Sequence, residues 1–310
     1  MILQILLLLA GLALVVFGAD YLVDGASSIA RRFGFSEFVI GLTIVGMGTS
    51  APEMVVSFIG AIQGNADISL GNVVGSNIFN TLLILGATAF ILPIGITREN
   101  IRRDIPINLL VTVLLVGMLS SGLSRWEGGV LLALFAWYMW DSFRKGVQAE
   151  EQPADGSTPR KVWISILMIV GGLCALIFGG RFFVNSATYI ARALNVSDKF
   201  IAITILAGGT SLPELATCVA AAIKKKGQLA LGNIIGSNIF NILLILGGSA
   251  LITPLANNGI TYVDMAALLV SAIALVAACF IGRKNQLDRL DGALFLLLFA
   301  AYMTYLIIKL

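Results

Sequence analysis

The sequence predicts an all-α polytopic membrane protein with ten transmembrane helices in two inverted five-helix repeats. Of its 310 residues, 58% are hydrophobic and 12% are charged, whereas a soluble domain carries roughly 25% charged residues. The mean hydropathy is +0.96. The apolar residues fall into ten long stretches, and motifs of the first half recur in the second half at an offset of 161 residues.

Each predicted span is an apolar stretch of about 20 residues, the length that crosses a bilayer as a helix. In chain order the spans cover residues 2–19, 38–62, 69–92, 105–122, 126–143, 162–182, 200–223, 230–252, 263–281 and 290–308. No basic residue precedes the first stretch, and its pattern recurs near Trp163 to Arg181. We therefore expect a retained helix there rather than a signal peptide.

Basic residues predict how the spans are oriented. Lys and Arg in alternate loops number fifteen on one side and five on the other, which is a strong positive-inside bias. The fifteen are Arg31, Arg32, Arg98, Arg102, Arg103, Arg144, Lys145, Arg160, Lys161, Lys224, Lys225, Lys226, Arg283, Lys284 and Arg289, and the five are Arg125, Arg181, Arg192, Lys199 and Lys309. This predicts a multi-pass protein of the inner or plasma membrane with both termini outside the cytoplasm.

The repeat divides the chain into a first five-helix unit at residues 1–145, a cytoplasmic linker at 146–161 and a second unit at 162–310. Residues 70–86 match residues 231–247 at 14 of 17 positions. Because each unit has an odd number of spans, the second enters the membrane in the opposite sense. Inverted repeats of this kind are found in many secondary transporters, with the substrate site near the midplane.

Several function classes lack the residues that they need. There is no histidine and no Gly-x-x-x-x-Gly-Lys-Ser/Thr phosphate loop, which argues against histidine-based catalysis and nucleotide hydrolysis. The basic residues form short clusters between spans, so nucleic-acid binding is not indicated. The three cysteines lie in apolar stretches and are expected to be packing residues. We expect a protein that is not an enzyme and has no resident cofactor.

Two carboxylates stand out by their depth. Glu53 and Glu214 lie inside apolar spans at equivalent repeat positions, whereas nearly all other acidic residues lie in loops or near span ends. A charge at the bilayer centre costs about 3 kcal/mol, and intramembrane acids are functional by default. A bound cation would neutralise the pair. The alternative is that each glutamate is protonated and only joins helices.

Broken helices are predicted around these acids. Pro52 and Pro213 lack an N–H group and free carbonyls of the preceding turn, which can line a cavity and coordinate an ion. Hydroxyl groups flank both acids, on Thr49, Ser50, Thr210 and Ser211. A proline kink that serves only packing is the alternative interpretation.

A second motif, Gly-Ser-Asn-Ile-Phe-Asn, follows each glutamate at a fixed interval and supplies Ser76, Asn77 and Asn80, or Ser237, Asn238 and Asn241. The two asparagines of each motif share a helix face. Interhelical hydrogen bonding is an alternative role for these amides. With the acids they make an all-oxygen ligand set, which suits Ca²⁺ or Na⁺ better than softer metals, and better than Mg²⁺, which dehydrates reluctantly.

At these motifs the chain resembles the cation/calcium exchanger superfamily, in particular its prokaryotic sodium/calcium exchanger branch. The resemblance is carried by GTSAPE at 48–53 with GTSLPE at 209–214, and by GNVVGSNIFN at 71–80 with GNIIGSNIFN at 232–241. It implies a Na⁺/Ca²⁺ antiporter whose long first and sixth helices slide against the other eight.

The resemblance also implies roles for residues. Glu53 and Glu214 would bind Ca²⁺ together with backbone oxygens of Thr49 and Thr210. Sodium sites would use the same glutamates, the backbone carbonyls of Gly46 and Ala207, and the hydroxyls of Ser50, Ser76, Ser211 and Ser237. The amides of Asn80 and Asn241 would complete the central site.

One departure from the family pattern leaves the coupling ion open. Several sodium/calcium exchangers carry aspartate at the position of Asn241. The amide removes proton coupling at that residue, but proton/calcium exchangers also have amides in this region. H⁺/Ca²⁺ exchange is therefore the nearest alternative, and a cation channel that uses the same glutamates is a more distant one.

Overall fold

The computed structural model describes residues 1–146, 160–194, 207–281 and 285–309, which are almost entirely helical. The π-helical segments carry the label η. The elements are α1 (Ile2–Phe33), α2 (Glu37–Ile40), η1 (Gly41–Val45), α3 (Gly46–Thr49), α4 (Ala51–Ile62), α5 (Ala66–Ile78), η2 (Phe79–Leu85), α6 (Gly86–Ile91), β1 (Ile94–Gly95), η3 (Asn100–Asp104), α7 (Ile105–Leu119), α8 (Arg125–Gly146), α9 (Val162–Ala193), α11 (Ala207–Gly209), α12 (Leu212–Ile223), α13 (Gly227–Phe240), η5 (Asn241–Leu246), α14 (Gly247–Ile252), α15 (Tyr262–Ile281), β2 (Gln286–Leu287) and α16 (Arg289–Lys309).

Within the described residues, each predicted span coincides with one helix or with a series of consecutive helical segments. Six helices of the described part of the chain are long and apolar enough to cross a membrane, and the bent pair 37–49 and 51–62, taken as one span, adds a seventh. The other three predicted spans correspond to α7, to α8, and, in its described part, to α11 with α12. Residues 200–206 of the seventh span, most of the 146–161 linker, and Lys199, Arg283 and Lys284 lie outside the described residues.

The first and sixth helices are longer than the predicted spans 2–19 and 162–182. α1 continues to Phe33 and ends at Gly34, which adopts the left-handed conformation with φ 69°. α9 continues to Ala193. Hydropathy marks where a chain becomes polar, but polar residues that find partners continue a helix without difficulty. The predicted ends at 19 and 182 were therefore wrong as helix ends.

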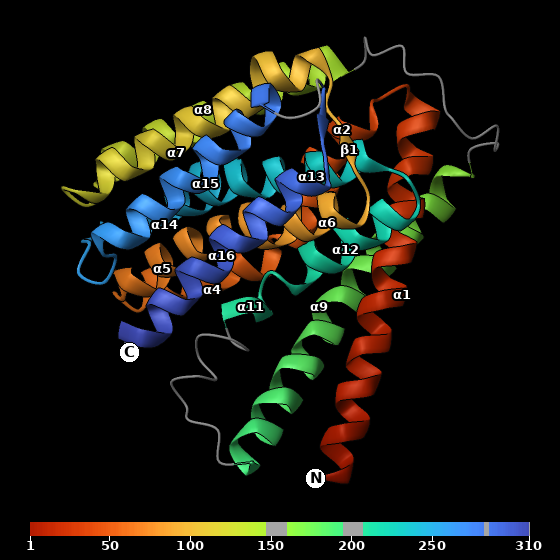
Figure 1. Cartoon of the computed structure of the whole chain (residues 1–310), viewed down its shortest axis with the longest axis horizontal. Helices are drawn as coiled ribbons and strands as arrows, with labels where there is room; N and C mark the ends of the chain where they lie inside the picture. Colours follow the sequence, from red (N-terminus) through yellow and green to blue (C-terminus); the bar gives the residue numbers. More distant parts are fainter. Residues whose placement is uncertain (147–159, 195–206, 282–284, 310) are drawn as a thin grey trace.

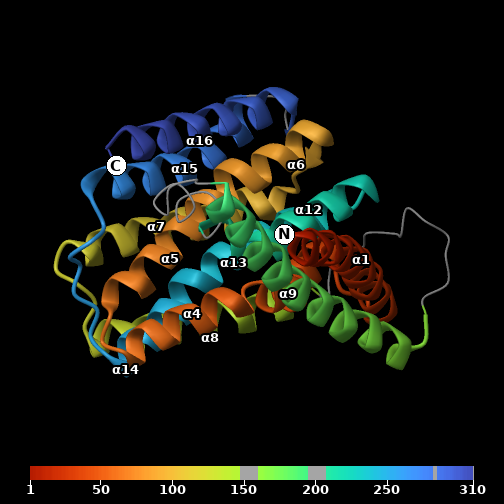
Figure 2. The same cartoon turned by 90° about the horizontal axis from the view of Figure 1, so that it is seen from below.

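α1 and α9 lie side by side and antiparallel, beside the bundle formed by the other helices (Figures 1 and 2). Glycines spaced seven residues apart bring the two backbones together. A Cβ atom added at Gly11 would lie 2.7 Å from the Gly179 carbonyl oxygen, and one added at Gly18 would lie 2.8 Å from that of Gly172. We call these positions, with Gly25 opposite Ser165, the glycine seam.

The centre of the bundle is the continuous run from α13 through η5 to α14, in which nearly every residue is buried. Gly232 and Gly236 of α13 press against α2 and η1, and a Cβ atom at either would collide with backbone oxygens of Phe38 or Leu42. Two short pairings join the halves at opposite ends: β1 with β2, where Ile94 pairs with Leu287, and an isolated bridge between Leu123 and Leu255.

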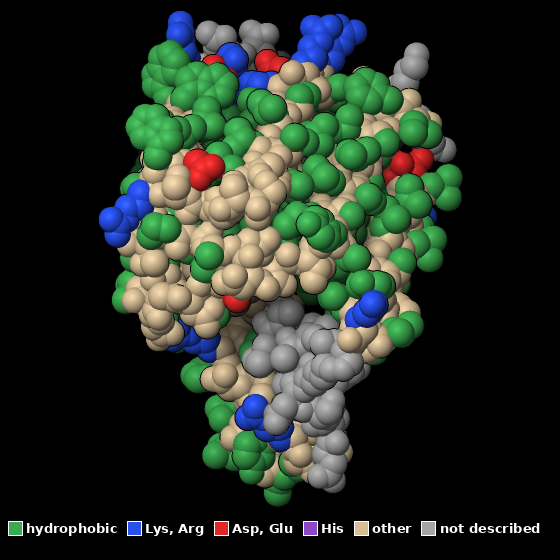
Figure 3. Space-filling view, turned by 90° about the vertical axis from the view of Figure 1, so that its left-hand side faces the viewer, with side chains coloured by type: hydrophobic (Ala, Val, Ile, Leu, Met, Phe, Trp, Pro, Cys, Tyr) green, Lys and Arg blue, Asp and Glu red, His purple; other side chains and the backbone are tan. Residues whose placement is uncertain are grey.

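Large hydrophobic side chains remain exposed on the peripheral helices, as expected for a lipid-facing surface. On the face shown in Figure 3, hydrophobic side chains are spread over the middle, and Lys and Arg side chains gather along the upper edge. The Cys174 side chain is exposed, unlike those of Cys218 and Cys279, so the prediction that all three cysteines pack internally was wrong for Cys174.

Candidate ion-binding site

Two equivalent helix breaks lie on either side of the bundle centre. At Ser50 the chain leaves helical geometry with φ −80° and ψ 6°, and at Ser211 with φ −86° and ψ 7°. The first break bends the helix by 48°. Each break is followed by proline in the first turn of a new helix, where the missing N–H group is tolerated. The predicted kinks are therefore complete breaks.

Glu53 and Glu214 lie in the first turns of α4 and α12, where the positive end of the helix dipole stabilises a carboxylate. Both side chains are buried, at 1% and 0% exposure, and they are close enough to interact electrostatically. Two like charges placed together in a low-dielectric interior repel each other strongly, which favours a bound cation.

Each carboxylate is held by a serine of the opposite repeat. The Ser50 hydroxyl donates to Oε1 of Glu214 at 3.1 Å, and the Ser211 hydroxyl donates to Oε1 of Glu53 at 3.2 Å. These two bonds cross between the halves. Neither repeat alone therefore completes the surroundings of its own glutamate.

The asparagines of the second motif also bond across the repeats. The amide of Asn241 donates to Oδ1 of Asn77 at 2.9 Å, and that of Asn80 donates to Oδ1 of Asn238 at 3.2 Å. Asn238 in turn donates to the Thr81 hydroxyl at 2.8 Å. These amides therefore form hydrogen bonds between helices. Asn80 and Asn241 use their NH₂ groups as donors, which leaves their Oδ1 atoms without a hydrogen bond.

Eight buried side-chain oxygens of the described residues have no hydrogen-bond partner, and four of them belong to predicted site residues. These four form two repeat-related pairs: Oε2 of Glu53 with Oε2 of Glu214, and Oδ1 of Asn80 with Oδ1 of Asn241. Unpaired buried acceptors are costly and need an explanation. Because Asn80 and Asn241 lie in the π-helical segments η2 and η5, local backbone widening accompanies them, as is frequent at functional sites.

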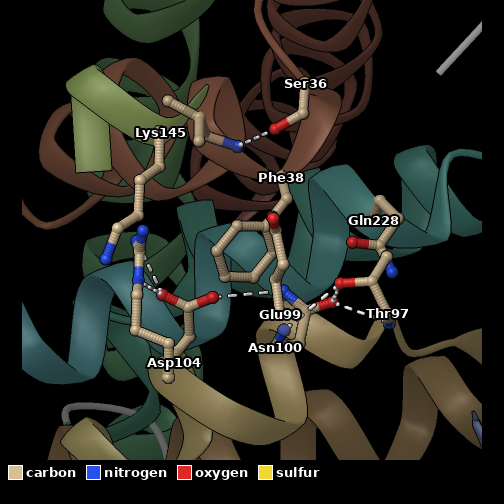
Figure 4. A pocket seen from close by; sticks show the side chains of 10 residues that line it. Ser36, Phe38, Thr97, Glu99, Asn100, Asp104, Lys145 and Gln228 are labelled. Atoms are coloured by element: carbon tan, nitrogen blue, oxygen red, sulfur yellow. Dashed lines mark hydrogen bonds and ion pairs between the residues drawn. The ribbon is translucent and has the colours of Figure 1, made fainter. Parts of the chain in front are cut away.

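A third buried acid, Asp104, shows what a satisfied carboxylate looks like in this protein. It lines a cavity of about 40 Å³ between α2, η3, α8 and α13 (Figure 4). Its oxygens accept from Arg103 at 2.9 Å, from Tyr138 at 3.1 Å and from Asn100 at 3.3 Å. In the sequence, Asp104 directly precedes the predicted span 105–122. It joins helices and has no carboxylate oxygen left free.

Some of the remaining predicted site residues lie directly beside the glutamate carboxyl groups, and others are placed only by the helix that carries them. Thr49 and Ser237 lie beside the Glu214 carboxyl group, and Thr210 lies beside that of Glu53. Ser76 is buried on α5. The Gly46 carbonyl accepts from the Ser50 N–H at 3.0 Å and from the Ser237 hydroxyl at 3.5 Å. Ala207 begins α11.

Two polar residues near the site were missed by sequence reasoning. Asn72 donates from its amide to the Glu53 carbonyl at 3.1 Å and to the Ser57 hydroxyl at 3.0 Å. Its repeat equivalent, Asn233, accepts from the Thr49 hydroxyl at 3.2 Å. Both stand in the Gly-Asn pair that opens the matched segments, so the repeat itself carried the signal.

A larger cavity of about 280 Å³ reaches the site from one side, between α4, α9 and the start of α12. Pro52, Thr210 and Pro213, the sequence neighbours of Glu53, Ser211 and Glu214, are among the residues that line it. Arg181 and Asn185 of α9 line it as well. This cavity therefore lies between the two helix breaks and the middle of α9.

Known proteins match this chain over almost its full length. The family model described as Sodium/calcium exchanger protein matches residues 3–143 and 164–308. The sodium/calcium exchanger MaX1 of Methanosarcina acetivorans is 34% identical over 344 aligned residues, which cover 97% of both chains. The inner membrane protein YrbG of Escherichia coli (strain K12) is 38% identical over 310 aligned residues, which cover 95% of this chain and 94% of YrbG.

Solved structures agree with this match. The sodium-calcium exchanger NCX_Mj soaked with 2.5 mM Na⁺ and 0.1 mM Ca²⁺ superimposes with a TM-score of 0.86 at 36% identity, covering 98% of both chains. The same exchanger soaked with zero Na⁺ and Ca²⁺ gives a TM-score of 0.87 at 35% identity. This protein is thus a ten-helix polytopic membrane protein and belongs to the sodium/calcium exchanger family.

Proposed function

We propose that this protein is a secondary active antiporter, rather than an enzyme, that exchanges Na⁺ for Ca²⁺ by alternating access. The observation that carries the proposal is the set of four buried, unpartnered oxygens contributed in repeat-related pairs by the two glutamates and two asparagines. Hard cations take six to eight oxygen ligands in flexible geometry. The names of the relatives MaX1 and NCX_Mj support the choice of ions.

The shared carboxylates supply the coupling in this proposal. One Ca²⁺ matches the charge of Glu53 and Glu214, and backbone oxygens of Thr49 and Thr210 would add ligands. Sodium ions would use the same carboxylates with hydroxyls and carbonyls, from Ser50, Ser76, Ser211, Ser237, Gly46 and Ala207. Because the ion sets share the glutamates, they exclude each other. Empty carboxylates in the membrane are costly, which discourages return without an ion.

Removing either carboxylate tests the site. Glu53→Gln and Glu214→Gln should each reduce radiolabelled Ca²⁺ uptake into sodium-loaded vesicles to the level of protein-free vesicles, because the neutral amide cannot balance a divalent ion. Glu127→Gln, on a partly exposed glutamate that accepts a hydrogen bond from Ser124, is the matched control and should transport normally. Uptake near the parent level in either buried variant, with folded protein, would contradict the assignment.

The coupling ion is tested by one flux experiment with three arms. Vesicles are given a sodium gradient at equal pH, a pH gradient without sodium, or neither. We expect Ca²⁺ uptake to follow the sodium gradient. Uptake that follows only the pH gradient would indicate H⁺/Ca²⁺ exchange. Uptake that needs no counter-ion would indicate a channel.

We also propose the sidedness that the basic residues predict, with both termini outside the cytoplasm and the 146–161 linker inside. The transported Ca²⁺ and Na⁺ and the surrounding lipid are the partners in this proposal. No resident cofactor is required, since exchange consumes only ion gradients.

A further inference from the structure

The two ends of an asparagine amide are nearly equal in size but opposite in hydrogen-bonding character. The oxygen accepts and can coordinate a cation, whereas the NH₂ group only donates and repels a cation. Packing alone therefore does not decide which end of Asn80 or Asn241 faces the proposed site. The orientation of each amide is set by the groups that bond to its other end, and two such sets of groups are present in the structure.

The first set starts at a backbone carbonyl and ends at Asn241. The Asn77 amide donates to the Asn238 carbonyl at 3.2 Å, and Oδ1 of Asn77 accepts from the Asn241 amide at 2.9 Å. A carbonyl oxygen can only accept, so Asn77 cannot reverse its ends without losing this bond. The NH₂ group of Asn241 is consequently held by Asn77, and the Asn241 oxygen is left without a partner among the described residues. We call this set the first arm.

The second set starts at a hydroxyl and ends at Asn80. The Asn238 amide donates to the Thr81 hydroxyl at 2.8 Å, and Oδ1 of Asn238 accepts from the Asn80 amide at 3.2 Å. The Asn80 oxygen is then left without a partner in the described part of the chain, like that of Asn241. We call this set the second arm. The repeat equivalent of Thr81 is Ile242, which has no hydroxyl, so the two arms begin differently.

Both arms are shielded from solvent. Each of their side chains is at most 2% exposed, namely those of Asn77, Asn80, Thr81, Asn238 and Asn241. If the Asn241 amide were reversed, its oxygen would face the Asn77 oxygen, and two buried acceptors would lie together without a proton between them. A buried polar group that loses its partner costs the desolvation of that group, so the orientations of the amides are firmly held.

We propose that Asn77 and Asn238 are positioning residues that hold the amides of Asn241 and Asn80 with their oxygens toward the bound cation, and that Thr81 anchors the second arm. The inference rests on the proposed function in that Asn80 and Asn241 belong to the ion site. Asn77 of the first half orients the ligand of the second half, and Asn238 of the second half orients that of the first. Each repeat therefore sets the ligand geometry of the other.

Thr81→Val tests the second arm without changing a proposed ligand. Valine has the shape of threonine without the hydroxyl, and the other half already carries an apolar β-branched residue, Ile242, at this position. Ca²⁺ binding to the purified protein is measured by isothermal titration calorimetry in the absence of Na⁺. The dissociation constant should rise about two- to tenfold, the equivalent of one hydrogen bond. Thr81→Ser, which keeps the hydroxyl, should bind like the parent.

Thr88→Val is the matched control. Thr88 lies on the same continuous helical run, residues 66–91, and is also buried, but its hydroxyl donates to the Ile84 carbonyl of that run at 2.6 Å. This variant should leave the affinity for Ca²⁺ unchanged. Equal weakening of Ca²⁺ binding in both valine variants, or an unchanged affinity in Thr81→Val, would overturn the proposal.

A carboxylate at the ligand position separates positioning from packing. Asn80→Asp presents an oxygen at either end, so the orientation of this group no longer depends on the second arm. In the Asn80→Asp background, Thr81→Val should change the affinity for Ca²⁺ by less than about twofold, as a double-mutant cycle measures. If the arm only joins helices, the loss should be the same in both backgrounds, and that result would contradict a positioning role.

The first arm provides an independent second cycle, which decides if a variant of the second arm does not fold. Asn77→Leu should raise the dissociation constant for Ca²⁺ about two- to tenfold in the parent, because the Asn241 amide is no longer held. It should have a smaller effect in the Asn241→Asp background. Equal losses in the two backgrounds would again indicate packing alone.

Failure of the positioning role and failure of the proposed function give different results. If Glu53→Gln binds Ca²⁺ as tightly as the parent, the ligands lie elsewhere, and the proposed function falls together with this inference. If Glu53→Gln abolishes binding while Thr81→Val and Asn77→Leu leave it unchanged, the ion site stands and only the positioning role is wrong.

Discussion

At the scale of single residues, the serines at the helix breaks combine two roles. In the structure each hydroxyl donates its proton to the glutamate of the opposite repeat, at 3.1 and 3.2 Å. When a cation binds those carboxylates, the same hydroxyl oxygen can turn its lone pairs toward the ion, because a hydroxyl both donates and accepts. Ser50 and Ser211 are thus suited to hold an empty carboxylate and to join a ligand shell.

This dual role predicts an ion-selective effect of removing a serine. Ser50→Ala and Ser211→Ala should each raise the Na⁺ concentration for half-maximal Ca²⁺ release about tenfold, since a hydrogen bond to a charged group is lost and a sodium ligand with it. The apparent affinity for Ca²⁺ should change less, because its proposed ligands are carboxylates and backbone oxygens. Exchange assays over a range of Na⁺ concentrations measure both.

Ser69→Ala is the control for this pair. Ser69 is also a buried serine, but it donates to the Ser57 carbonyl at 2.6 Å, away from the carboxylates. It should leave both ion dependences unchanged. An equal loss of Na⁺ and Ca²⁺ affinity in Ser50→Ala would argue against a sodium-specific role.

At the scale of elements, the glycine seam makes α1 and α9 a single unit although they come from different halves of the chain. Small residues allow close approach of membrane helices, where there is no hydrophobic driving force between them. Here the carbonyl oxygens of one helix occupy the space that side chains would fill on the other. The pair can therefore move as one body.

Adjacent glycines of α9 provide a test of the seam. A Cβ atom at Gly172 would lie 2.7 Å from the Gly18 carbonyl oxygen, whereas one at Gly171 would have no heavy atom of the described residues within 4 Å. Gly172→Ala should lower the midpoint of thermal unfolding, because overpacking costs about 1–3 kcal/mol. Gly171→Ala should be neutral or stabilise slightly, since alanine favours helix over glycine by up to about 1 kcal/mol.

The comparison is decided by the difference between the two variants. Thermal unfolding followed by tryptophan fluorescence in the same detergent gives both midpoints. If Gly171→Ala is as destabilising as Gly172→Ala, the seam does not depend on close backbone contact.

At the scale of the whole molecule, the inverted repeat is predicted to place the loops rich in Lys and Arg on one face and the loops with few of them on the other. Ser121 lies exposed between α7 and α8, and Lys145 lies exposed near the end of α8. In sealed vesicles with a Cys174→Ala background, an impermeant maleimide added outside should label Ser121→Cys and not Lys145→Cys in right-side-out vesicles. Labelling in the reverse order would overturn the proposed sidedness.

The sequence was sufficient for the architecture because burial in lipid demands long apolar stretches, and it was sufficient for the paired glutamates because acids rarely occur within them. It was insufficient for the ends of α1 and α9; in α1, Asp20 and Asp24 lie beyond the predicted end and pair with Lys224, about 200 residues away. It also did not find the crossed serine–glutamate bonds, because they depend on how the two halves interlock, which no local pattern contains.

The crossed bonds at the site also have a consequence for how the protein is made. Glu53 is synthesised 158 residues before Ser211, the residue whose hydroxyl donates a hydrogen bond to it. While the ribosome completes the second half, the first five helices carry an acid whose partner does not yet exist. The surroundings of Glu53 can therefore be completed only after the second half has been synthesised.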